Sequence, residues 1–213
     1  YAILGLLAGF LSLIYIRYAD SVDGLFQRVI LKKFPQWLVM TIIGLIVGIC
    51  GYFFHDILGI GYNAINKMIT SNITWQIVTV LLIMKFILVP LILYSGGFGG
   101  LFAPSLFIGA CFGYIYAILL NTLWGIQVDT TTYVLVSMGA VLGGINSIPI
   151  SAILIIFEMT RDYTFILPLM LAVVTSTTIV QLILKGSIHE KHLERQGFFI
   201  SRGTYAPPAF NIA

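Results

Sequence analysis

The stretch from Ser95 to Pro104 contains the residue types from which an anion site is built. It reads S-G-G-F-G-G-L-F-A-P, with glycines at positions 96, 97, 99 and 100. Glycine adds flexibility and leaves backbone N–H groups unscreened by side chains. Pro104 suits the first turn of a helix, and the free N–H groups of a helix N-terminus bind anions. The stretch therefore favours a helix that starts at a buried anion, although a plain loop between two membrane helices fits the glycines equally well.

The composition places the chain in a lipid bilayer, as an integral, multi-pass membrane protein. Of its 213 residues, 59% are hydrophobic and 9% are charged, whereas about a quarter of the residues of a soluble domain are charged. The net charge of +3 is small and the basic residues lie in loops and in the tail, so nucleic-acid binding is not expected. The cysteines show neither a disulfide framework nor metal-ligand spacing, and no metal or other cofactor is expected.

The elements that must position this stretch are apolar helices. The pattern predicts membrane helices over residues 2–16, 37–54, 75–94, 105–123 and 164–184, and shorter helices over 63–70, 133–145 and 150–157. Neither of the last two short helices crosses a bilayer alone, and a break at Asn146 to Pro149 separates them. Such broken pairs are typical of discontinuous transporter helices. Two small-residue pairs, Gly5-x-x-x-Gly9 and Gly44-x-x-x-Gly48, are candidate close-packing faces.

Polar and basic residues suggest how the chain is divided. Arg17 and Asp20 predict the end of the first membrane helix, and the positive-inside rule predicts a cytoplasmic location for the basic tail. The start has no initiator methionine, basic region or cleavage motif, so we expect a piece of a longer chain. The predicted parts are a membrane helix (1–18), an interfacial linker (19–36), a main helical unit (37–184) and a tail or linker (185–213).

Two ionisable residues close to the predicted site have alternative interpretations. Lys85 lies in the middle of an apolar helix, where a charge is costly and rarely faces lipid. It either reaches a polar partner near the interface or raises the electrostatic potential for anions in a pathway, and we favour the second interpretation. Glu158, at the end of a short helix, is either a proton relay or a structural residue bonded to Thr160, Arg161 or the backbone.

Three stretches together resemble one family. Gly100 to Pro104, G-L-F-A-P, fits the G-x-F-x-P anion motif of CLC chloride channels and chloride/proton antiporters. Residues 137–160, from S-M-G-A through S-I-P to F-E-M-T, are similar to the next block of that family. Residues 162–168, D-Y-T-F-I-L-P, are similar to the segment that carries its central tyrosine. The order and spacing of the three agree over nearly the whole chain.

The resemblance implies an all-α integral membrane fold with discontinuous and re-entrant helices. In that family two inverted repeats form the membrane domain, and the protein is a homodimer with one pore per subunit. Residues 37–184 would be the second repeat, and the N-terminal repeat, with its serine and gating glutamate, would lie outside this chain. The implied function is transport of chloride or a similar small anion, by channel conduction or by exchange with protons. The sequence leaves that choice open.

The resemblance also implies a binding site for a chloride ion. The implied anion-binding residues are Gly100, Leu101, Phe102 and Tyr163: the backbone N–H groups of Leu101 and Phe102 would donate to the ion, and the Tyr163 hydroxyl would close the site. Neutral donors of this kind hold an ion loosely enough for rapid passage. The implied supporting residues, in the pathway or in the structure around it, are Lys85, Ala103, Pro104 and Glu158. A β-branched residue at position 100 is expected to clash at the turn, and Glu158 is expected to be structural, because the family's proton acceptor lies in the missing half.

Three other classes of function make different demands on the sequence. A cation-coupled secondary transporter with broken helices is expected to have several carboxylates in its spans, and this chain has almost none there. An intramembrane enzyme needs a nucleophile and base or a set of metal ligands, which the spans do not offer, so an enzyme is not predicted. A membrane scaffold that transports nothing remains an alternative for a free half.

The predicted role of Tyr163 has a direct test. In the full-length protein, Tyr163→Phe removes the hydroxyl and is expected to weaken chloride binding, because a neutral donor to the ion is lost. Isothermal calorimetry with chloride measures the change. An unchanged affinity would show that Tyr163 does not contact the ion.

Overall fold

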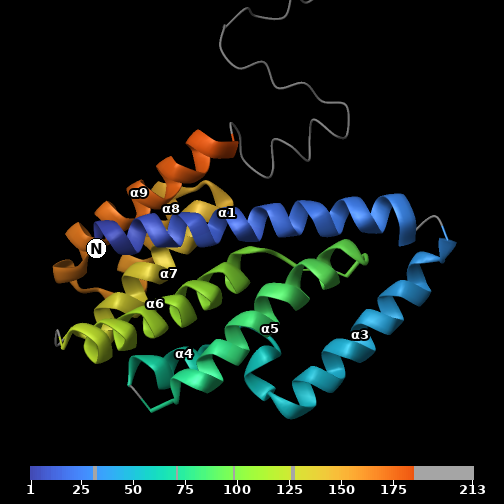
Figure 1. Cartoon of the computed structure of the whole chain (residues 1–213), viewed down its shortest axis with the longest axis horizontal. Coiled ribbons are helices and arrows are strands. Elements are labelled where there is room, and N and C mark those ends of the chain that lie inside the picture. Colours follow the sequence, from blue (N-terminus) through green and yellow to red (C-terminus); the bar gives the residue numbers. More distant parts are fainter. Residues whose placement is uncertain (31–32, 71, 98, 126–127, 185–213) are drawn as a thin grey trace, which may run out of the picture.

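The structure is a computed structural model, and it describes residues 1–30, 33–70, 72–97, 99–125 and 128–184. Within these ranges the chain is helical and contains no strand, which confirms the all-α prediction (Figure 1). The elements are α1 (Ala2–Leu25), the π-helical turn η1 (Phe26–Ile30), α3 (Gln36–Phe53), the 3-10 turn η2 (His55–Ile57), α4 (Tyr62–Ile69), α5 (Trp75–Tyr94), α6 (Phe102–Trp124), α7 (Thr130–Asn146), α8 (Pro149–Thr160), the 3-10 turn η3 (Tyr163–Phe165) and α9 (Ile166–Leu184).

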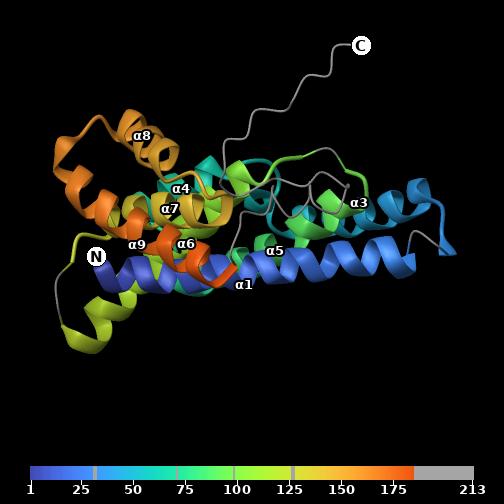
Figure 2. The ribbon, with the colours of Figure 1, turned by 90° about the horizontal axis from the view of Figure 1, so that it is seen from above.

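Helix α7 forms the centre of the bundle. Every residue from Val134 to Ile145 is buried, and α7 packs against α6 on one side and against α1 and α9 on the other (Figures 1 and 2). A helix that is apolar on all faces is stable only when neighbours surround it. This explains why a helix of 17 residues can serve as the core while five longer segments have the length and composition to cross a membrane.

Small residues allow the helices around α7 to approach closely. A Cβ atom built at Gly5 would lie 2.8 Å from the carbonyl oxygen of Ala172 in α9, and one at Gly9 would lie 3.1 Å from that of Ser176. The first predicted glycine pair is therefore a packing face between α1 and α9. The second pair behaves differently, since a Cβ atom at Gly44 or Gly48 would meet no atom of the described residues within 4 Å.

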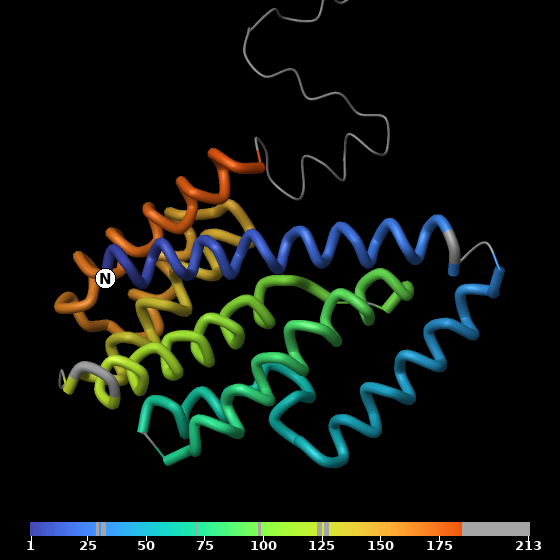
Figure 3. Tube along the Cα trace, in the orientation of Figure 1, coloured from blue at the N-terminus to red at the C-terminus, as the bar shows by residue number. Residues whose placement is uncertain are grey.

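The predicted end of the first helix at Arg17 is wrong. Helix α1 continues to Leu25 and passes directly into η1, so much of the predicted interfacial linker is a continuation of this helix (Figure 3). Polar side chains do not stop it, because their bonding groups are satisfied locally: Ser21 Oγ donates to the Arg17 carbonyl at 2.8 Å. Farther along, Val22 and Phe26 pack in one cluster with α3. Burial of these two side chains stabilises the extension.

The other predicted helices are confirmed within a few residues, and the differences have local causes. Helix α7 begins three residues earlier than expected because the Asp129 carboxylate caps it, accepting hydrogen bonds from the backbone N–H groups of Thr131 and Thr132. The hydrogen bond from the Thr132 hydroxyl, together with these, lowers the pKa of Asp129. The predicted break after α7 is present, since Ser147 is left-handed with φ of 57° and Pro149 opens α8. The tail, 185–213, with its predicted cytoplasmic location, lies outside the described residues.

The tight contact between α6 and α7 predicts a steric effect. A Cβ atom at Gly113 would lie 2.4 Å from the Tyr133 carbonyl oxygen, whereas one at Gly48 meets open space. Gly113→Ala is expected to destabilise the full-length protein by about 2 kcal/mol, since overpacking forces backbone shifts. Gly48→Ala is the matched control, and the better helix propensity of alanine should leave it neutral or stabilising. Thermal unfolding in detergent measures both, and equal melting temperatures would contradict the packing argument.

Candidate anion-binding site

The glycine-rich loop joins α5 to α6 and reverses the direction of the chain (Figure 3). It leaves α5 with a hydrogen bond from Gly97 N–H to the Ile92 carbonyl oxygen at 3.1 Å. Ser95 Oγ donates to the same carbonyl at 2.8 Å. Gly96 has φ of 100°, a conformation that residues with a side chain rarely adopt. The loop therefore needs glycine at position 96 to make its turn and deliver the chain to the start of α6.

The first turn of α6 presents backbone donors that the protein leaves free. Pro104 is the third residue of the helix and has no N–H group, as predicted for a first turn, and Ser105 N–H donates to the Leu101 carbonyl oxygen at 3.0 Å. Among the described residues, no protein oxygen accepts a hydrogen bond from the N–H groups of Leu101, Phe102 or Ala103. Uncapped amides at a helix N-terminus carry a partial positive charge and suit an anion.

A cavity of about 280 Å³ lies beside this turn. Gly99, Gly100 and Pro104 line one part of it, and Gly59 and Lys85 line another. Its remaining lining is apolar and comes from Val47, Ile57, Leu58, Val89, Ile92 and Leu93. The structure thus brings the predicted supporting residues Lys85 and Pro104 to the same cavity as the glycine loop.

Lys85 is buried and forms no ion pair among the described residues, although the Asp56 carboxylate, which pairs with Lys67, also interacts with it electrostatically. Its side chain is 2% exposed, Nζ donates to the Gly59 carbonyl oxygen at 2.8 Å, and the same atom lies 4.1 Å from the centre of the Phe107 ring. The carbonyl and the ring face are partners that a buried ammonium group requires. Within the described ranges no carboxylate forms an ion pair with Lys85, so its charge raises the potential of the cavity.

The expected clash at Gly100 is not present within this chain. A Cβ atom at position 100 would meet no atom of the described residues within 4 Å, because the loop faces the cavity at this point. The described residues therefore leave room for the first side-chain atom, and the expected effect of a β-branched residue on flux stays a prediction. What Gly100 contributes is an open approach to the backbone.

Tyr163 does not join this cavity. Its side chain is 76% exposed, and its ring packs against Phe157 with 5.0 Å between ring centres. It lies in η3, at the turn between α8 and α9, whereas the start of α6 lies nearer the middle of the bundle in both views (Figures 1 and 2). Tyr163 is not among the residues that line the cavity, and the role predicted for its hydroxyl stays a prediction.

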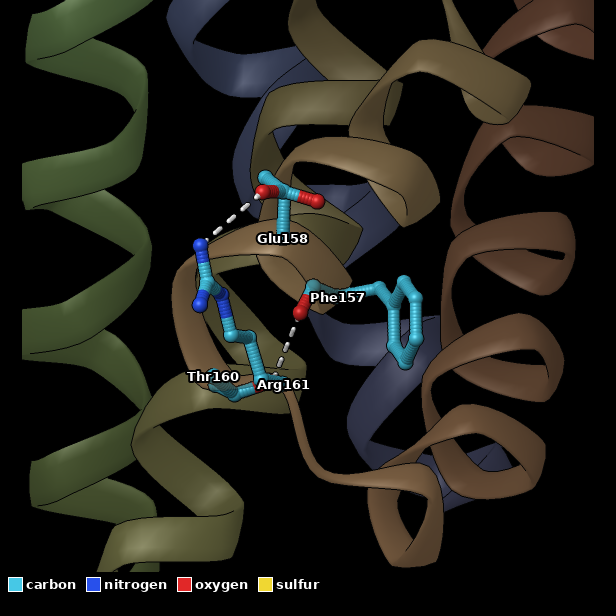
Figure 4. A network of polar contacts seen from close by, with 4 residues as sticks. All are labelled: Phe157, Glu158, Thr160 and Arg161. Atoms are coloured by element: carbon cyan, nitrogen blue, oxygen red, sulfur yellow. Dashed lines mark hydrogen bonds and ion pairs between the residues drawn. The ribbon is translucent and has the colours of Figure 1, made fainter.

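Glu158 lies on the surface of α8 in this chain, and its side chain is 73% exposed. Its carboxylate lies 3.7 Å from the Arg161 guanidinium group, one of the partners expected from the sequence (Figure 4). The Thr160 hydroxyl instead donates to the Ile156 carbonyl oxygen at 3.0 Å. Arg161 ends α8 in a left-handed conformation, and its N–H donates to the Phe157 carbonyl oxygen at 2.7 Å (Figure 4). The pair therefore lies at the end of the helix, where an exposed ion pair contributes little stability.

Comparison with known proteins decides the family. The profile of the family described as Voltage gated chloride channel matches residues 1–181. The chain belongs to this family. A putative chloride channel protein, ClcB-like, from Ralstonia nicotianae is 34% identical over 193 residues, which cover 90% of this chain and 44% of that protein. The H(+)/Cl(-) exchange transporter ClcA of Klebsiella pneumoniae is 26% identical over 197 residues, which cover 92% of this chain and 42% of that protein.

Solved structures of the CLC family have the same fold. A slow cyanobacterial Cl-/H+ antiporter matches with a TM-score of 0.79 and 27% identity, over 92% of this chain and 46% of that one. A eukaryotic CLC transporter matches with a TM-score of 0.78 and 27% identity, over 92% of this chain and 34% of that one. These matches and the apolar helices show an integral, multi-pass membrane protein. The chain spans less than half the length of each of these relatives.

Two residues of this CLC chain that sequence reasoning missed support the first turn of α6. Ser105 is 1% exposed, and its hydroxyl donates to the Phe102 carbonyl oxygen at 2.7 Å. Asn146, the last residue of α7, donates from Nδ2 to Ser105 Oγ at 3.2 Å. The polar residue directly after the G-L-F-A-P motif was a signal in the sequence for Ser105. No local pattern pairs it with Asn146, which lies 41 residues away.

The cavity geometry predicts that Lys85 increases anion affinity by its charge. Lys85→Met in the full-length protein keeps a long apolar side chain and removes the charge. It is expected to raise the chloride dissociation constant by about tenfold, which corresponds to about 1.4 kcal/mol. This is smaller than the Coulomb energy between two unit charges in close contact near a protein surface. Lys67→Met is the matched control, because Lys67 is half exposed and pairs with Asp56 at 3.6 Å. Equal chloride affinities of the two variants by calorimetry would contradict this role.

Proposed function

We propose that this chain forms half of the pathway through which a CLC-type membrane protein moves chloride or a similar small anion. The observation that carries the proposal is the first turn of α6, where the N–H groups of Leu101 and Phe102 have no acceptor among the described residues, while the flanking Gly100 and Pro104 line a cavity together with buried Lys85. The membership of the chain in a family described as chloride channels supports the choice of ion.

The proposed site binds by dipoles and not by direct contact with a cation. An anion that leaves water loses its hydration shell, and the free amides replace part of it. Lys85 Nζ contacts the Gly59 carbonyl oxygen and the Phe107 ring. Its charge therefore attracts the anion, while the ammonium group itself does not contact the ion directly. A full countercharge in contact would slow release, whereas amide donors give moderate affinity. This balance is the one that fast passage of an ion requires.

The remaining parts of the pathway are proposed to come from residues outside this chain, since the chain spans less than half of each relative compared. Conduction and exchange with protons are both open to such a protein, and one relative bears the name of an H(+)/Cl(-) exchange transporter. Assembly as a homodimer in the bilayer is part of the same proposal. A pH electrode that records proton movement during chloride flux from liposomes separates exchange from conduction.

Removal of one donor tests the site itself. Phe102 is the first residue of α6, so Phe102→Pro deletes its N–H group without removing an intrahelical hydrogen bond, although proline also disfavours the αR backbone of the preceding Leu101. In the full-length protein it is expected to raise the chloride dissociation constant by about tenfold or more, since charge-assisted hydrogen bonds are the strong ones. Phe102→Leu keeps the N–H group and serves as the control for loss of the ring.

A second measurement keeps this test independent of how well the proline variant folds. Crystals of the full-length wild-type protein in bromide are expected to show anomalous density within hydrogen-bond distance of the Leu101 and Phe102 amides. Absence of such density at saturating bromide, together with normal flux, would place the pathway elsewhere and overturn the proposal.

A further inference from the structure

We infer that Ser105 is a positioning residue: its hydroxyl strengthens the free Ala103 N–H group in the first turn of α6, next to the Leu101 and Phe102 donors, and Asn146 orients it. The inference rests on the proposed function, because it concerns the donors of the same site. Ser105 makes two contacts with the first turn of α6. Its backbone N–H donates to the Leu101 carbonyl oxygen at 3.0 Å, and its hydroxyl donates to the Phe102 carbonyl oxygen at 2.7 Å.

Each of these carbonyl groups belongs to a peptide unit whose N–H group is free. The Leu101 carbonyl shares its peptide with the Phe102 N–H, and the Phe102 carbonyl shares its peptide with the Ala103 N–H. A carbonyl that accepts a hydrogen bond becomes more polarised, and its own N–H becomes a stronger donor. Ser105 therefore donates hydrogen bonds to the carbonyl oxygens of two consecutive peptide units. The N–H groups of these two units have no protein acceptor among the described residues.

The Ser105 hydroxyl is an additional donor to the Phe102 carbonyl oxygen. In a regular helix the Phe102 carbonyl also receives the N–H of the residue four positions later, Leu106, at the crowded start of the helix. The Ser105 hydroxyl adds a donor to the turn, and at 1% exposure it has no competing water. It also holds the turn in one geometry.

Asn146 fixes the direction in which the Ser105 hydroxyl donates. Its Nδ2 group donates both to Ser105 Oγ and to the Leu142 carbonyl oxygen, each at 3.2 Å. With its oxygen accepting from Asn146, the Ser105 hydroxyl directs its hydrogen to Phe102. The result is a relay from Asn146 through Ser105 to the Phe102 carbonyl. It ties the end of buried α7 to the start of α6.

Replacement of the hydroxyl tests the relay in the full-length protein. Ser105→Ala is expected to raise the chloride dissociation constant by about threefold, because cooperative strengthening is a fraction of each hydrogen bond. The matched control is Ser12→Ala in α1: Ser12 is equally buried and its hydroxyl donates to the Ala8 carbonyl oxygen at 2.8 Å. Ser12→Ala loses one hydrogen bond and Ser105→Ala loses two, so the fall in melting temperature should be at least as large for Ser105→Ala, but only Ser105→Ala should change chloride affinity. Ser105→Thr retains the hydroxyl and is expected to restore it.

The link to α7 is tested by Asn146→Leu, which preserves the approximate volume and removes the donor. Its effect on chloride affinity should be smaller than that of Ser105→Ala and should disappear in the Ser105→Ala background, since residues in one network do not act additively. If wild type and Ser105→Ala bind chloride equally, the relay is refuted while the proposed function stands. If the wild-type protein shows no anion at the start of α6, the proposed function itself fails.

Discussion

In a bilayer, backbone N–H and carbonyl groups must find partners inside the protein, because hydrocarbon offers none. The first turn of α6 is an exception to this requirement, since the N–H groups of Leu101 to Ala103 have no acceptor among the described residues. Such groups are costly unless water or a ligand reaches them. Gly99, Gly100 and Pro104, which flank these amides, line a cavity, and the ligand proposed here is an anion because free amides at a helix N-terminus favour negative charge.

The rest of the bundle holds this turn in place. Buried α7 packs along α6, and its last residue, Asn146, contacts the first turn of α6 through Ser105. On the other side, Lys85 of α5 reaches the Gly59 carbonyl oxygen and the Phe107 ring in α6. The amides are thus fixed between two rigid neighbours. Because these dipoles are preorganised, little free energy is needed to reorient them when an ion binds.

The balance of charges in the site follows from the same constraint. Lys85 gives positive potential but is held by neutral partners, and the only described partner of Glu158 is Arg161 at the surface of α8. Neither a carboxylate nor a contacting cation therefore dominates the cavity. Neutral donors in a positive field attract an anion and still release it, which is the behaviour expected of a transport pathway.

Local patterns were sufficient for much of this protein. Apolar length located the membrane helices, glycine and proline located the loop before α6 and the break before α8, and motifs located the family. Local patterns misplaced the end of α1, because Val22 and Phe26 gain their stability from contacts with α3 and not from their neighbours in sequence. The joint site of Tyr163 and Phe102 stays a prediction, since Tyr163 is exposed and packs against Phe157 in this chain.

The chemistry of the donors can be predicted from a short stretch of sequence, because glycine and proline around Leu101 and Phe102 indicate a helix start with free backbone amides. The side-chain contacts that support those donors join residues far apart in the sequence. Lys85 and Gly59 are 26 positions apart, and Ser105 and Asn146 are 41 positions apart. Such pairs depend on how helices cross, and crossing depends on the packing of whole faces. The sequence alone therefore identified what the site is made of, and the folded structure identified which side chains support it.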